Sequence, residues 1–151
     1  MEEILKKAAD ISISGLHMTD GEKSAVEEKN KGYISKRGQS TYLITESGEG
    51  VRTMIKLTKS RVEVKKSLLK KEKTASGTVI SELVYEEGQT VSGFYHTPYG
   101  KFDIETETRS LHRSETEKGI QCNISGNIKM NGSPVSEFNL EIVAAVIDRS
   151  F

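Results

Sequence analysis

Apolar and polar residues alternate along most of this chain with a period of two, the pattern of β-strands that bury one face. The alternation is strictest over residues 120–130, where isoleucines, Cys122 and Gly126 share one face and polar residues share the other. Over residues 102–107 the same alternation sets an apolar or threonine face against an acidic face. We therefore expect an all-β chain whose strands turn the apolar face toward a core.

Short strands are expected at roughly ten places, with turn signals about every eight to twelve residues. The expected strands are residues 11–17, 32–35, 41–45, 51–57, 61–65, 78–85, 90–96, 101–108, 120–130 and 136–146. Residues 19–28 are too charged to belong to a core, and we expect them to lie outside it. Residues 1–9 are expected to form a short helix or a disordered lead.

Two turns carry strong hairpin signals. In residues 93–108 one strand ends at His96, and the turn Thr97-Pro98-Tyr99-Gly100 leads into a second strand. Pro98 already has the φ that the second position of a type I turn requires, and Gly100 suits the left-handed residue that often follows. Asn131-Gly132 is typical of a tight two-residue hairpin. Short turns of this kind pair neighbouring strands as an antiparallel meander.

A meander of this many strands leaves two exposed edges unless it closes on itself. We therefore predict a single all-β domain over residues 1–151, an antiparallel, mostly up-and-down closed barrel. Interior glycines, among them Gly15, Gly93 and Gly126, are expected to mark bulges or sharp bends. The low apolar content of 34% and the charged content of 29% suit a thin β structure with a solvated outer face.

The charge balance argues against nucleic acid and membrane partners. The chain has 22 basic and 22 acidic residues, so no net charge attracts a polyanion. Basic residues do gather between Arg52 and Lys73, but no aromatic residue lies among them to stack on bases. We interpret this stretch as solvated strand surface that discourages edge-to-edge association.

Cysteine usage indicates a reducing compartment. Cys122 is the only cysteine, so no intramolecular disulfide can form. Residues 1–10 begin with acidic side chains and include no long apolar run, unlike a secretory signal. No segment approaches the roughly 18 apolar residues of a membrane span. We expect a cytoplasmic protein.

Several segments taken together resemble the YwiB-like family, a family of unknown function from Gram-positive bacteria that is placed with the calycin-type, lipocalin-like barrels. The matching pieces are Gly32-Tyr33-Ile34 with Thr41-Tyr42-Leu43, residues 93–108 and residues 124–140, and their order and spacing also fit. The resemblance covers most of the chain from about residue 11 onward and implies a small closed barrel. It implies no activity, and no catalytic or ligand residue follows from it.

No constellation of residues points to catalysis or to a metal. Cys122 shares its face with isoleucines, so we interpret it as an inert core thiol. The acids of residues 103–107 share one face, which we assign to solvent. The histidines lack metal-ligand spacing and lie on different expected elements: His17, His96 and His112. We expect no cofactor and no bound metal.

The interior decides between the functional hypotheses. Its expected side chains are mostly medium-sized aliphatics, and the chain has no tryptophan to fill a barrel. We therefore predict a mainly apolar cavity for a small hydrophobic or amphipathic molecule, bound without catalysis. The expected lining residues are Tyr95, Phe102, Thr106 and Cys122, with Tyr33 and Tyr42 on the opposite wall.

Two alternatives remain open. A solid core closed by Phe94, Phe138 and Met54 would favour a protein-interaction or assembly module. Convergence of Tyr95, His96 and carboxylates at the barrel mouth would favour an enzyme. No partner chain or oligomeric state follows from the sequence.

Overall fold

Ten antiparallel strands form a closed barrel in the computed structural model, which describes residues 5–69 and 78–147. The strands are β1 (Leu5–Thr19), β2 (Glu22–Arg37), β3 (Ser40–Glu46), β4 (Val51–Leu57), β5 (Arg61–Leu68), β6 (Thr78–Glu86), β7 (Thr90–Thr97), β8 (Gly100–Thr116), β9 (Gly119–Met130) and β10 (Ser133–Val146). Each strand pairs with its neighbours in sequence, and β1 pairs with β10 to close the ring. The predicted all-β, up-and-down barrel is therefore confirmed.

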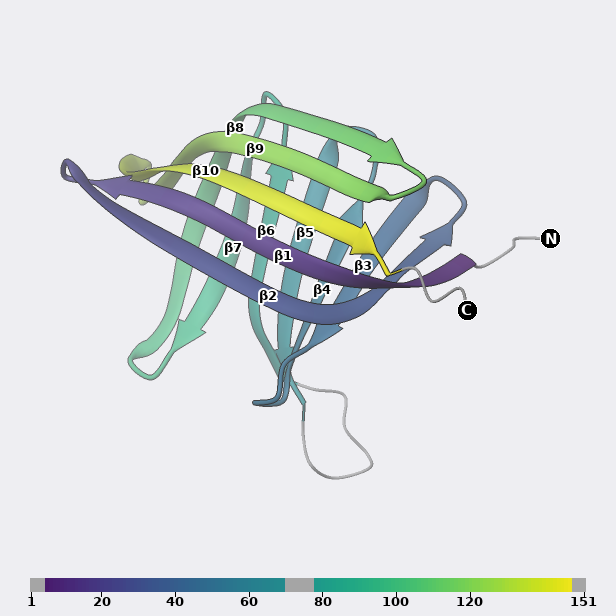
Figure 1. Cartoon of the computed structure of the whole chain (residues 1–151). Helices are drawn as coiled ribbons and strands as arrows, with labels where there is room; N and C mark the ends of the chain where they lie inside the picture. The colour runs from purple at the N-terminus through teal and green to yellow at the C-terminus, as the bar shows by residue number, and fades with distance from the viewer. Residues whose placement is uncertain (1–4, 70–77, 148–151) are drawn as a thin grey trace.

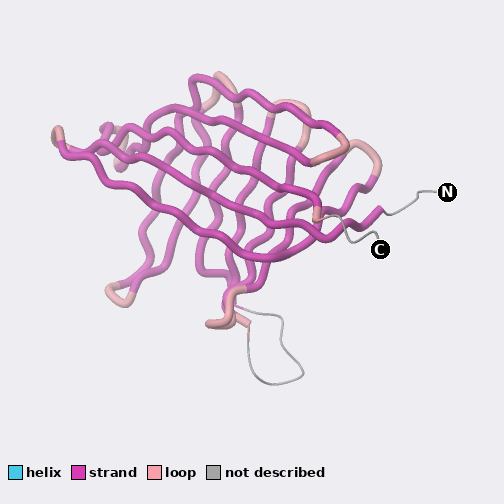
Figure 2. The backbone as a smooth tube through the Cα atoms, in the orientation of Figure 1, coloured by secondary structure: helices cyan, strands magenta, loops and turns pink. Residues whose placement is uncertain are grey.

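Figure 2 shows strands joined by short loops over the described residues, without a helix. No helix in this part of the chain is thus long and apolar enough to span a membrane. The helix considered for residues 1–9 does not form over residues 5–9, which belong to β1, and residues 1–4 lie outside the described part. Ala9 pairs with Val146 on one side and Gly32 on the other. These two ladders use the backbone groups that a helix would satisfy internally.

Tight turns produce the meander. Asn131 and Gly132 join β9 to β10 with φ values of 52° and 79°, so the predicted hairpin forms there. Asp20 and Gly21 have φ values of 51° and 78° and join β1 to β2 in the same way. Residues 22–27 are exposed, as their charge predicted, yet they are part of β2. The sequence analysis missed this strand because a segment with two solvated faces shows no apolar alternation.

The barrel is flattened into two layers of strands that cross each other steeply (Figure 1). β1, β2, β9 and β10 form one layer, β3–β7 form the other, and the long β8 bends from one to the other. We call the end with the β2–β3, β4–β5, β6–β7 and β8–β9 turns the closed end, and the end with the β1–β2, β7–β8 and β9–β10 turns the open end. β3 pairs with β2 only from Gly32 onward, so the β1–β2 hairpin projects beyond this ladder at the open end.

The bend of β8 depends on a bulge. Its pairing with β9 shifts between Thr108 and Ser110. Gly126 lies at this point, and a Cβ there would lie 2.0 Å from the carbonyl oxygen of Glu107. The expectation that an interior glycine marks a bend is thus confirmed at Gly126. Before the bulge the even-numbered side chains of β8 point inward, and beyond it the odd-numbered ones do. Leu111 is therefore a core residue.

Packed side chains fill the middle of the barrel. Aliphatic residues from both layers form one cluster, and Phe138 of β10 contacts Tyr85 of β6 edge to face, with ring centroids 5.4 Å apart. Phe138 therefore closes the core, as expected in the alternative with a solid core. Phe94 and Met54 do not, because each alternates with inward neighbours and faces outward. On β8 the alternation is confirmed: Ile104 and Thr106 are buried and the acidic side chains face out.

Candidate binding site

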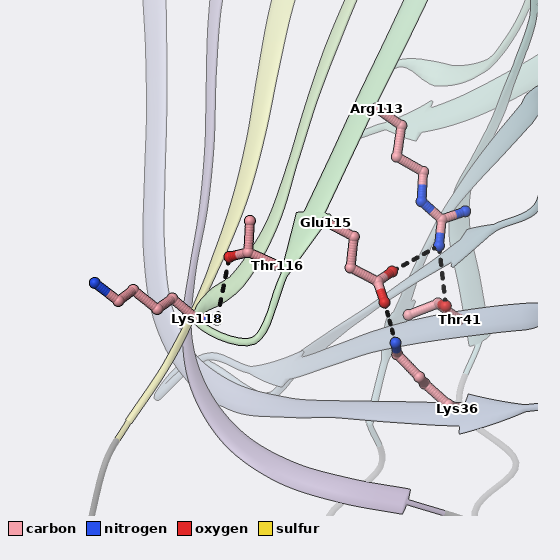
Figure 3. Close-up of polar contacts among 6 residues, drawn as sticks. All are labelled: Lys36, Thr41, Arg113, Glu115, Thr116 and Lys118. Carbon is pink, nitrogen blue, oxygen red and sulfur yellow. Dashed lines mark hydrogen bonds and ion pairs between the residues drawn. The ribbon is translucent and has the colours of Figure 1, made fainter.

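Charged side chains cross the barrel at its closed end (Figure 3). Arg113 of β8 donates to Thr41 Oγ1 on β3 at 3.2 Å and to the Thr58 carbonyl oxygen at 3.3 Å. Its guanidinium also donates to Glu115 at 3.1 Å, and Glu115 accepts a further bond from Lys36 of β2. The network ties β8 to strands on the far side of the barrel, and these polar contacts cross the closed end beside buried aliphatic side chains such as Leu57 and Ile120.

The hydrogen bond from Lys36 holds the pKa of Glu115 below its ordinary value, and Arg113 adds to this effect against the opposing cost of desolvation. A hollow of about 70 Å³ lies beside the network and is bounded partly by Ile34, Ile120 and Val146. Ligand sites usually measure roughly 300–1,000 Å³. The closed end is therefore too tightly filled to be the main candidate.

A trough of about 500 Å³ lies between the layers at the open end. Seven strands contribute to it, β1 and β5 through β10. Its apolar lining consists of Leu83, Tyr95, Ile104, Ile128, Met130 and Val135; its polar lining consists of His17, Thr19, Lys66, Ser81 and Ser136. Its size and mixed lining are typical of a small-molecule site, and we call it the open-end trough.

The charged group of the trough is Lys66. It lies directly opposite Ser81 in the β5–β6 ladder, so both side chains point to the same face. Its ammonium pairs with the carboxylate of Glu28 on β2. Glu28 belongs to the projecting β1–β2 hairpin, where it pairs with Ile13 of β1. The ion pair therefore spans the mouth of the trough between two strands that are not neighbours in the sheet.

Of the six residues expected to line a cavity, Tyr95 lines the trough. Phe102 stacks on it, with ring centroids 5.4 Å apart and an interplanar angle of 20°. Thr106 and Cys122 lie in the packed interior, with exposed fractions of 1% and 0%. Thr106 donates to the carbonyl oxygen of Val84 and so has its hydroxyl satisfied. The structure thus brings Tyr95 and Phe102 together and separates them from the other two.

Tyr33 and Tyr42 lie on the outer face of the barrel. Each alternates with buried neighbours on its strand, Ile34 and Leu43 respectively. Lys6 lies over the Tyr33 ring at 5.1 Å, and Lys56 lies over the Tyr42 ring at 6.0 Å. Neither tyrosine contributes to the trough, because a strand turns successive side chains to opposite faces.

The trough residues that the sequence analysis missed include His17, Lys66 and Leu83. Lys66 follows Val62 and Val64 at intervals of two, and that period was the signal for its inward direction. Because Lys66 is charged, the sequence analysis instead grouped it with the basic residues between Arg52 and Lys73. In the structure this stretch is partly neutralised, since Arg61 pairs with Glu86 at 3.1 Å. Three further lysines of the stretch, Lys70, Lys71 and Lys73, lie outside the described residues.

The other titratable candidates do not converge on the trough. His96 is exposed and points away from Tyr95, its neighbour in sequence. Glu107 is held on the outer face by Lys129 at 2.8 Å, which lowers its pKa. Burial raises the pKa of the Cys122 thiol to about 11. Over residues 5–69 and 78–147, no three His, Cys, Asp or Glu side chains are grouped to hold a metal ion.

Comparison with known proteins places the fold. The model of the family described as Domain of unknown function (DUF1934) matches residues 11–142. No curated protein matches this chain. The crystal structure of ywiB protein from Bacillus subtilis is similar, with a TM-score of 0.75 and 18% sequence identity over 95% of this chain and 94% of that chain. The resemblance to the YwiB-like family is confirmed, and at this identity the structural likeness shows a shared fold.

Proposed function

The chain belongs to the family described as Domain of unknown function (DUF1934), and this membership brings no activity with it. We therefore propose a function from the geometry of the barrel: the protein binds a small amphipathic molecule in the open-end trough. The observation that carries the proposal is the trough itself, about 500 Å³ in volume with an apolar floor. A floor of aliphatic and aromatic side chains favours burial of an apolar body. Polar groups along the rim can orient the remainder of the molecule.

Binding without catalysis is the better reading of this site. An enzyme at the barrel mouth would need acid, base or nucleophilic groups within hydrogen-bonding reach of one another. Tyr95 points into the trough while His96 points away, and the acids of residues 103–107 face outward. As part of the proposal we place the protein in the cytoplasm, because a single buried thiol suits a reducing compartment.

Titration with N-phenyl-1-naphthylamine, an uncharged dye that fluoresces in apolar sites, tests the proposal. We expect saturable binding to the wild-type protein. Ser81→Trp should abolish it, because the indole would occupy the trough beside Tyr95. Ser92→Trp is the matched control, since Ser92 is exposed on the outer face of β7. Absence of saturable binding to the wild type, or equal binding to both tryptophan variants, would overturn the proposal.

Protein interaction remains a second candidate because of one surface feature. Leu16 and Met18 are 52% and 39% exposed on the outer face of the projecting hairpin. Exposed apolar side chains gathered on one element are common at interaction sites. Light scattering after size-exclusion chromatography would test this candidate. An oligomer that Leu16→Lys with Met18→Lys converts to a monomer would support it, and a monomeric wild type would leave self-association without support.

A further inference from the structure

The open-end trough carries one positive side chain and no acidic lining residue among those the structure describes. Its eleven lining residues include Lys66 but neither Asp nor Glu. Hydroxyl groups from Ser81, Ser136 and Thr19 lie around the same space. This chemistry suits an anionic oxygen group, which accepts hydrogen bonds from an ammonium and from hydroxyls.

We propose that the ligand is an anionic amphiphile whose acidic group replaces the carboxylate of Glu28 on Lys66. The inference rests on the proposed function and names the class of molecule bound. The apolar body would lie on Ile104, Ile128 and Leu83, with the acidic group toward Lys66 and Ser81.

The Lys66–Glu28 pair is suited to exchange. Glu28 is not a lining residue, and it approaches Lys66 from the part of β2 that lies beyond the ladder with β3. The side chains of Lys66 and Glu28 are 26% and 37% exposed. An ion pair this accessible to water contributes little to stability. A bound anion would restore a partner to Lys66 while burying apolar area that Glu28 cannot bury.

Among residues 5–69 and 78–147, the other lysines near the trough face elsewhere. Lys129 of β9 points outward to Glu107, and Lys101 of β8 lies over the outward ring of Phe94 at 4.8 Å. His17 lines the trough on the β1 side and can add a donor. Within the part of the chain that the structure describes, Lys66 is thus the lysine that an acidic group inside the trough meets.

The test compares two dyes of almost the same body, neutral N-phenyl-1-naphthylamine and anionic 8-anilinonaphthalene-1-sulfonate. Lys66→Gln should weaken sulfonate binding about tenfold and change the binding of the neutral dye less than about twofold. Lys66→Arg should retain most of the sulfonate affinity, since it keeps the charge. Glu28→Gln should strengthen sulfonate binding by about two- to fivefold, because it removes the competing carboxylate.

Lys129→Gln is the matched control, since it removes the same charge from an ion pair on the outer face. It should leave both affinities unchanged. If the neutral dye binds but Lys66→Gln and Lys129→Gln affect the sulfonate equally, the anionic class is wrong and the proposed function stands. If neither dye binds the wild-type protein, the proposed function fails as well.

Discussion

Thr106 on β8 donates a hydrogen bond to the carbonyl oxygen of Val84 on β6, although β7 lies between these strands in the sheet order. The β6–β7 ladder holds only through the pairs Ser81–Tyr95 and Glu82–Phe94. Where the two strands separate, the buried threonine supplies the partner that a ladder would otherwise supply. A side chain thus replaces a missing backbone bond next to the trough.

Removing that hydroxyl should destabilise the barrel. We expect Thr106→Val, which keeps the shape, to lower the free energy of unfolding by about 1–3 kcal/mol, because it leaves a buried carbonyl without a donor. Thr106→Ser keeps the hydroxyl and should cost less than the valine variant. Urea unfolding followed by circular dichroism measures both. Equal stability of Thr106→Val and the wild type would show that water satisfies the carbonyl.

Glu115 should contribute to stability in a pH-dependent way. Its pKa is lower in the folded protein than its ordinary value of 4.5, chiefly because of the hydrogen bond from Lys36. The ionised form is therefore favoured by folding, and this contribution is present at neutral pH and lost as pH falls through the folded-state pKa.

We expect Glu115→Gln to lower the free energy of unfolding at pH 7 by about 0.5 kcal/mol, since the pair is partly exposed. The difference from wild type should vanish in acid, once the pH has fallen through the folded-state pKa of Glu115. Glu117→Gln, an exposed position on the neighbouring turn, serves as the control. A difference that persists unchanged in acid would mean that the ionisation of Glu115 is not its source.

Cys122 should react slowly in the native protein. Its side chain is fully buried, and burial raises the pKa of its thiol from 9.0 to about 11. The thiolate fraction at pH 8 is then about 100-fold lower than for an exposed thiol, before access is considered. Iodoacetamide labelling followed by mass spectrometry compares native and urea-unfolded protein. Similar rates in both would place the thiol at the surface.

Gly126 should not tolerate a side chain. Because a Cβ there would lie 2.0 Å from the Glu107 carbonyl oxygen, we expect Gly126→Ala to cost about 2–3 kcal/mol or more. Gly48→Ala is the comparison, since a Cβ at Gly48 meets nothing within 4 Å. That variant should remain within about 0.5 kcal/mol of wild type. Thermal unfolding of the two variants, monitored side by side, decides the matter, and equal melting temperatures would contradict the close approach at the bulge.

Much of the fold could be predicted from the sequence because the alternation of apolar and polar residues along a strand shows which of its side chains face the core. Alternating positions point to opposite faces whatever the partner strand is. The inward direction of Ile104, Cys122 and Ile124 could therefore be predicted from the local sequence. The turn at Asn131-Gly132 could be predicted in the same way, because its residues readily adopt the positive φ that a tight hairpin needs. The strand over residues 22–31 gave no such signal, since its side chains meet water on both faces over most of its length.

Which inward residues border empty space is a property of the tertiary structure. Cys122 and Tyr95 both face inward, but the first lies in the packed core and the second at the open end. The difference depends on the height of each residue along the barrel and on the side chains of the opposite layer, which come from distant parts of the chain. The bulge at Thr108 likewise changes the parity of β8, so the inward direction of Leu111 follows from the bend and not from the alternation before it.

The candidate site shows the same division. Period two alone places Lys66 on the inward face of its strand, as it places Val64. Its ion pair with Glu28 depends on the tertiary arrangement, because β2 continues beyond its ladder with β3 and there meets β5, which is not its neighbour in the sheet. The sequence by itself thus determined the face of each strand, and the three-dimensional arrangement decided which of those faces meet.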